Sequence, residues 1–188
     1  MQIREDFLHN LLKDNLMDTT LEMELEEDFA FLKSLREVSD YELERGKPMP
    51  TQQHSLTQLN LSTALKIRYR KQFVILPELT IELGKKTAVP DISIYPYYPI
   101  EWGAEDPAAK AEPPLVAIEI ISPSQTLTEI RDKARKYFAQ GVKSCWIVQP
   151  ELQTISVLHP GEKPRTFDTG MVEDTLVGIQ IPIEEVFE

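Results

Sequence analysis

The 188 residues are enough for one domain of ordinary size, and the single cysteine excludes an internal disulfide. No apolar run approaches the roughly 20 residues of a membrane helix, and no basic segment leads into an apolar stretch at the N-terminus, so we expect a soluble, cytoplasmic protein without a signal peptide. The net charge of −11 argues against a protein that coats nucleic acid, because phosphate neutralisation needs clustered Lys and Arg.

The acidity is concentrated at the N-terminus. Residues 1–45 hold 5 basic and 13 acidic side chains, a net charge of −8, whereas residues 46–188 hold 15 and 18, a net charge of −3. Apolar residues recur at helical spacing within residues 1–38. We therefore predict an acidic, helical N-terminal extension over residues 1–38 and one domain over residues 39–188.

The domain is predicted to open with a short strand and a turn over residues 41–50, followed by a helix over residues 54–71. Apolar side chains form two stripes on this helix. They are Leu61, Ala64, Leu65 and Tyr69 in one stripe, and Leu56, Leu59 and Ile67 in the other. We expect the helix to be covered on more than one side, and together with the amphipathic extension this predicts a homodimer.

Three strands are predicted next. Apolar and polar residues alternate over 78–83, which indicates one covered face. Residues 89–95 follow, and after a proline-rich loop the nearly uniform apolar run 115–121 is typical of a strand buried on both sides.

A helix over residues 126–140 comes after these strands, because Thr126 and Glu129 form a capping-box pattern and Gly141 marks the helix end. Further strands are predicted at 144–149, at 154–158 as its hairpin partner, and at 179–181. We predict an α/β fold in which strands 78–83, 89–95, 115–121 and 144–149 form one mixed sheet flanked by helices 54–71 and 126–140.

Glu119 stands out because it is a carboxylate in the middle of an apolar strand, where an unpaired charge costs several kcal/mol. Asp91, after Pro90, is the natural second carboxylate on a neighbouring strand. Two carboxylates with water and phosphate oxygens suit Mg²⁺ or Mn²⁺. A buried salt bridge for Glu119 and a turn position for Asp91 are the structural alternatives.

The remaining polar candidates are weaker. Glu42, His54 and Glu78 are secondary candidates for the site, with helix-cap or strand-end roles as alternatives. Cys145 lies in an apolar run and is interpreted as a core thiol. Two basic clusters could contact nucleic acid or simply face solvent: Lys66, Arg68, Arg70 and Lys71 in the first, and Arg131, Lys133, Arg135 and Lys136 in the second.

The sequence resembles the Uma2 family of nuclease-like bacterial proteins in the PD-(D/E)XK superfamily, over roughly residues 40–187. The resemblance rests on several motifs in order: Tyr41-Glu42-Leu43, Gly46, His54, Pro90-Asp91, Glu119-Ile120-Ile121-Ser122-Pro123-Ser124, Lys133, Tyr137, Gly141-Val142 and Trp146-Ile147-Val148.

This resemblance implies a restriction-endonuclease-like core with a metal ion between Asp91 and Glu119. The superfamily's usual lysine position, two residues after the glutamate, is occupied by Ile121, and the resemblance implies that Lys133 supplies the cation instead. Gln149 stands where many members have an acid. The expected function is Mg²⁺- or Mn²⁺-dependent phosphodiester hydrolysis, with DNA as the expected substrate. A nuclease acting on RNA or on a small nucleotide, and a non-catalytic binding module, are the alternatives.

Overall fold

The computed structural model describes residues 49–105, 108–122 and 125–188. The chain divides into two compact units, Met1–Met49 and Pro50–Glu188, and the second unit contains all the elements described below. The predicted extension, its boundary with the domain, and Glu42 lie outside the described residues and stay predictions. Within the described part of the chain, no helix has both the length and the apolarity to cross a membrane.

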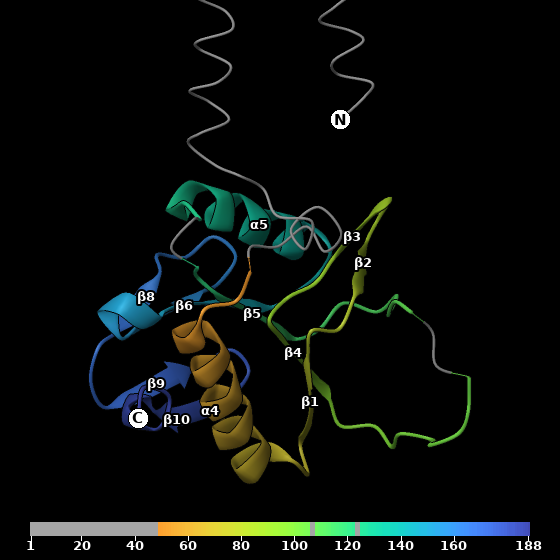
Figure 1. Cartoon of the computed structure of the whole chain (residues 1–188). Helices are drawn as coiled ribbons and strands as arrows, with labels where there is room; N and C mark the ends of the chain where they lie inside the picture. The colour runs from red at the N-terminus through yellow and green to blue at the C-terminus, as the bar shows by residue number, and fades with distance from the viewer. Residues whose placement is uncertain (1–48, 106–107, 123–124) are drawn as a thin grey trace, which may run out of the picture. The chain divides into compact units, whose positions relative to one another are not determined.

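A six-stranded mixed sheet forms the centre of this second unit (Figure 1). Its strands, in spatial order, are β1 (Phe73–Pro77), β4 (Ile92–Pro96), β5 (Val116–Ile120), β6 (Ser144–Gln149), β7 (Thr154–Leu158) and β8 (Arg165–Phe167). Neighbours are antiparallel except β5 and β6, which are parallel. All residues of β5 are buried, so the predicted central strand is confirmed.

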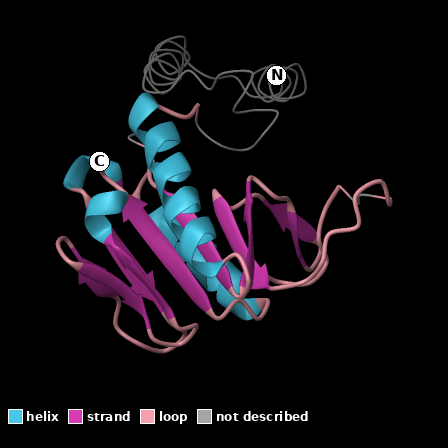
Figure 2. Cartoon of the chain, turned by 90° about the horizontal axis from the view of Figure 1, so that it is seen from below, coloured by secondary structure: helices cyan, strands magenta, loops and turns pink. Residues whose placement is uncertain are grey.

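The two helices cover opposite faces of the sheet. Leu65 of α4 (Gln52–Tyr69) shares a core with Ile118 of β5, whereas Tyr137 of α5 (Leu127–Ala139) shares the other core with Ala117. Successive residues of a strand point to opposite faces, so these two cores lie on the two sides of the sheet. Figure 2 shows α4 lying over one face of the sheet.

Side-chain caps determine where the helices begin. Thr51 accepts a hydrogen bond from the backbone N–H of His54 at 3.2 Å, so α4 starts two residues before the predicted residue 54. The predicted capping box is present at the start of α5, where the Thr126 hydroxyl accepts from the N–H of Glu129 at 3.3 Å. The first cap brings His54 into the first turn of α4.

One predicted strand of the sheet is wrong. Residues 78–83 do not join the main sheet; only Ile81–Leu83 is extended, as β2, and it pairs with β3 (Lys86–Ala88) in a separate two-stranded sheet. The edge of the main sheet is instead β1, from the uninterrupted apolar run before Pro77. Alternation indicates one covered face but not what covers it, and a strand covered on both faces needs no alternation.

The C-terminal strands form a second small sheet of β9 (Met171–Asp174) and β10 (Ile179–Pro182). Buried Asp174 accepts from the indole N–H of Trp146 at 2.8 Å and lies 3.0 Å from Nε2 of His159. Backbone N–H groups of Leu176 and Val177 also donate to it. These bonds connect β9 to the main sheet, so His159 has a structural role here.

The second apolar stripe of α4 is not covered within the described chain. Leu56, Leu59 and Ile67 are 47%, 62% and 69% exposed. Pairing of two chains through this stripe would remove it from water, so we expect a dimer. Light scattering at micromolar concentration is the measurement, and the exposed substitutions Leu59→Lys and Ile67→Lys should yield a monomer. A wild-type monomer would contradict the expectation.

Candidate metal-binding and catalytic site

The two predicted carboxylates lie side by side at one end of the sheet. Ile92 of β4 pairs with Ile118 of β5, and extending this antiparallel register by one residue sets Asp91 opposite Glu119. Directly opposed residues have Cβ atoms about 5 Å apart. Both side chains are buried, with residue exposures of 3% and 2%.

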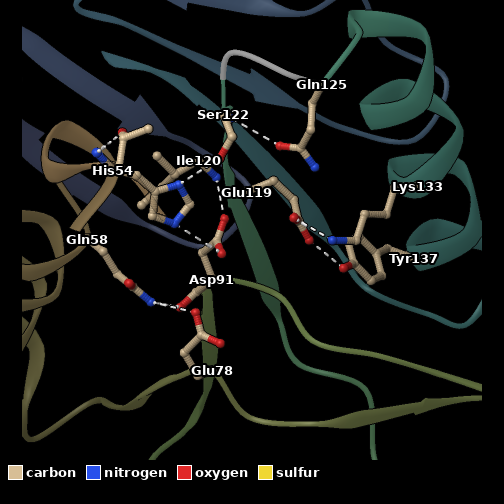
Figure 3. A network of polar contacts seen from close by, with 11 residues as sticks. His54, Gln58, Glu78, Asp91, Glu119, Ile120, Ser122, Gln125, Lys133 and Tyr137 are labelled. Carbon is tan, nitrogen blue, oxygen red and sulfur yellow. Dashed lines mark hydrogen bonds and ion pairs between the residues drawn. The ribbon is translucent and has the colours of Figure 1, made fainter. Parts of the chain in front are cut away.

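Glu119 is held by two side chains of α5 (Figure 3). Lys133 Nζ lies 2.6 Å from Oε2, and the Tyr137 hydroxyl donates to Oε1 at 2.5 Å. Burial raises the pKa of the Glu119 carboxyl, the charge of Asp91 raises it further, and Lys133 opposes both. Burial beside Glu119 also raises the pKa of Tyr137, so its hydroxyl keeps the proton that it donates.

The orientation predicted for α5 is confirmed. Ile130, Ala134 and Tyr137 are buried against the sheet, while Arg131 and Arg135 are exposed. Lys133 lies on the inward face, with 26% of its side chain exposed. Its ammonium group therefore reaches a buried carboxylate while its side chain keeps contact with solvent.

Asp91 caps the end of the ladder between β4 and β5. Its Oδ2 accepts a hydrogen bond of 2.6 Å from the backbone N–H of Ile120, just past the last pair of the ladder. Its Oδ1 lies 3.5 Å from Nε2 of His54. A buried backbone N–H without a partner is costly. The Asp91 carboxylate therefore also has a structural role, because it accepts the hydrogen bond of the Ile120 N–H.

Several polar residues near Asp91 were not predicted. Gln58 donates to the backbone carbonyl of Asp91 at 2.8 Å and contacts Oε1 of Glu78 at 3.4 Å. Ser122 Oγ lies 3.3 Å from Nδ1 of His54. The sequence pattern that could have identified Gln58 is its spacing, because Gln58 follows His54 by four residues and so lies on the same face of the helix.

His54 and Glu78 therefore both belong to the neighbourhood of Asp91. His54 is 7% exposed and Thr51 is the N-cap of α4, so the alternative role of His54 as a surface helix cap is wrong. Glu78 lies between β1 and β2 with a φ of 55°, an unusual value for a residue with a side chain, and its N–H donates to the Asp91 carbonyl at 3.2 Å. Non-glycine residues held in this region are found preferentially at functional sites.

The donor set fits a small divalent cation with incomplete protein coordination. Within residues 49–105, 108–122 and 125–188, no three His, Cys, Asp or Glu side chains form a metal-binding group. Asp91 and Glu119 supply two carboxylates, and Mg²⁺ is commonly bound by one or two carboxylates with water and substrate phosphates completing its shell. Burial is the main cause of the raised pKa of Glu119, and the negative charge of Asp91 adds to it; a divalent cation would offset both.

The other predicted groups lie as follows. Cys145 is fully buried and burial raises the pKa of its thiol, which confirms it as a core residue. The basic clusters are exposed apart from Lys133, with Arg68 paired to Glu185 and Arg135 to Asp132. Nucleic-acid contact by these clusters stays a prediction.

Comparisons with known proteins agree with this architecture. The Uma2 family model, described as "Putative restriction endonuclease", matches residues 27–184. A crystal structure described as a "putative nuclease belonging to DUF820" from Anabaena variabilis ATCC 29413 is 26% identical, with a TM-score of 0.65, and the alignment covers 75% of this chain and 83% of that chain. No curated protein matches the sequence. The predicted α/β, restriction-endonuclease-like fold is confirmed.

Proposed function

Because the chain belongs to the Uma2 family, we propose that it is a metal-dependent endonuclease that hydrolyses phosphodiester bonds, with DNA as its substrate. The observation that carries this proposal is the buried pair of Asp91 and Glu119 beside the ammonium group of Lys133. The cap on the Ile120 N–H accounts for one oxygen of Asp91, but it does not account for a second buried acid with Lys133 beside it. Buried ionic groups of this kind are often neutral or unfavourable for folding.

Asp91 and Glu119 would hold Mg²⁺ or Mn²⁺ through their carboxylate oxygens. When bound, such an ion polarises a phosphodiester and lowers the pKa of a coordinated water. Each carboxylate oxygen that now accepts one hydrogen bond retains a further lone pair. Tyr137 would keep Glu119 oriented, since its hydroxyl donates a hydrogen bond to Oε1 of that carboxylate.

Among the described residues, Lys133 is placed to act on the attacking water or the phosphate. Its Nζ contacts Glu119 and its side chain is partly exposed, so a substrate could reach it. A lysine there can orient water, exchange a proton or offset charge that develops on the phosphate. Lys133 of α5 would thus take the role of the lysine that the superfamily usually has at the position of Ile121.

DNA is favoured as substrate by the family description as a restriction endonuclease. Exposed Arg131 and Lys136 lie on the helix that carries Lys133, where contacts to the phosphate backbone would position a strand over the site. Because the acidic residues concentrate in residues 1–45, the remainder of the chain carries a net charge of only −3.

The test compares cleavage by wild type, Asp91→Ala and the exposed control Asp168→Ala, with supercoiled plasmid in Mn²⁺, Mg²⁺ or chelator. Loss of a metal-binding carboxylate removes several kcal/mol of transition-state stabilisation, so Asp91→Ala should cleave at least about 100-fold more slowly. Asp168→Ala should match wild type. Single-stranded RNA is the second substrate arm. Wild type that binds Mn²⁺ but cleaves neither polymer would support a non-catalytic role instead.

A further inference from the structure

We propose that His54 is a positioning residue that orients the Asp91 carboxylate, and that Ser122 holds the His54 ring with its proton on Nε2. This inference rests on the proposed function, because the carboxylate is oriented for a divalent cation. His54 does not touch the reacting atoms in this arrangement; it acts through Asp91.

The His54 ring bridges two polar groups from different parts of the chain (Figure 3). Nδ1 lies 3.3 Å from Ser122 Oγ, and Nε2 lies 3.5 Å from Asp91 Oδ1. The second distance is longer than an ordinary hydrogen bond and is an electrostatic contact in this structure. An ionised carboxylate can only accept, so a hydrogen bond from His54 to Asp91 requires the proton on Nε2. In the neutral ring Nδ1 is then an acceptor, and the Ser122 hydroxyl is its donor.

Ser122 is itself fixed. It is 3% exposed, comes two residues after Ile120, and its N–H donates to Gln125 Oε1 at 3.1 Å. The end of β5 therefore acts on Asp91 twice: directly, through the Ile120 N–H on Oδ2, and indirectly, through Ser122 and His54 on Oδ1. A hydrogen bond on Oδ2 and the imidazole 3.5 Å from Oδ1 together restrict rotation of the carboxylate plane.

The same helix also holds the main chain of Asp91. Gln58, one turn after His54, donates to the Asp91 carbonyl at 2.8 Å. The first turns of α4 thus restrain both the backbone and the carboxylate of one acid. Side chains that orient a ligand in this way commonly affect metal affinity by about 10–100-fold.

A purely structural role for His54 would affect stability alone, so the experiment measures Mn²⁺ affinity by calorimetry alongside thermal unfolding. His54→Gln places an amide nitrogen near the position of Nε2, whereas His54→Asn reaches only the position of Nδ1. We expect about 10-fold weaker Mn²⁺ binding in His54→Ala and His54→Asn, and recovery to near wild type in His54→Gln. Gln53→Ala, an exposed neighbour, is the control and should bind as wild type does.

Equal Mn²⁺ affinity in folded His54→Ala and wild type would overturn the inference, as would equal losses in the Gln and Asn variants. The ring proton supplies a readout that needs no metal. The chain has three histidines, so the nitrogen resonances of His54 can be assigned by comparison with His54→Gln.

In the neutral ring we expect the His54 proton on Nε2, where it faces the Asp91 carboxylate. Ser122→Ala should remove the donor to Nδ1 and shift the tautomer balance. A proton on Nδ1 alone in wild type would overturn the inference, because Nε2 could then not donate to Asp91. Wild type that binds no Mn²⁺ would overturn the proposed function, and the tautomer would still decide whether His54 donates to Asp91.

Discussion

Glu119→Gln is expected to abolish stabilisation of the fold by Mn²⁺. An ion that binds only the folded state stabilises it by about 2.7 kcal/mol at a concentration of 100 times Kd. For a chain of this length that corresponds to a rise in Tm of about 5–10 °C in wild type. The amide keeps the shape of Glu119 but lacks the charge that a hard cation requires, so the variant should show no rise.

The control for this prediction is Glu151→Gln, an exposed carboxylate on the surface after β6, which should retain the full Mn²⁺ shift. Calorimetry on the same proteins should agree, with heat of binding absent from Glu119→Gln alone. Equal Mn²⁺ shifts in the two variants would show that the cation binds elsewhere, and Asp91 and Glu119 would then be a structural pair.

The raised pKa of Glu119 also predicts how stability depends on pH without metal. In the window between its ordinary value of 4.5 and the raised value, the folded state holds more protons at this site than the unfolded state does. The contribution of this group to the free energy of unfolding is therefore lost as pH rises through that window. Glu119→Gln should lack this part of the pH dependence, measured as the difference between the two stability curves.

Lys133→Met is expected to cleave about 100-fold more slowly than wild type while remaining folded. The methionine fills the same inward position but cannot exchange a proton or offset charge on the phosphate. Mn²⁺ affinity should not fall, because removal of a cation 2.6 Å from Glu119 Oε2 removes a competitor for that carboxylate. Single-turnover cleavage and calorimetry measure the two effects separately.

Two further variants sharpen the interpretation of Lys133. The control is Lys163→Met, which removes an exposed cation that lies outside α5 and should cleave as wild type does. Lys133→Arg keeps the positive charge but cannot give up a proton, so partial activity would indicate charge stabilisation, and full loss would indicate proton transfer. Unchanged cleavage in folded Lys133→Met would make Lys133 a structural partner of Glu119.

The sequence by itself determined those features of the fold and site that depend on residues close together along the chain. A carboxylate between Ile118 and Ile120 is identifiable as a buried charge because burial follows from the apolar residues on both sides of it. The inward placement of Lys133 follows from its spacing with Ile130, Ala134 and Tyr137, and the start of α5 follows from its capping box. In each case the physical cause acts within a few residues.

The tertiary structure alone decided which segments meet. Residues 78–83 alternate as a sheet strand should, but the continuous run of β1 occupies the sheet edge, because alternation specifies a covered face and not a partner. The contacts of His54 with Ser122 and Asp91 join three segments separated by at least 31 residues, since the cap at Thr51 sets the position of the helix and the end of β5 sets the position of Ser122. Local propensity carries no information about such long-range contacts, which depend on how the helix packs on the sheet.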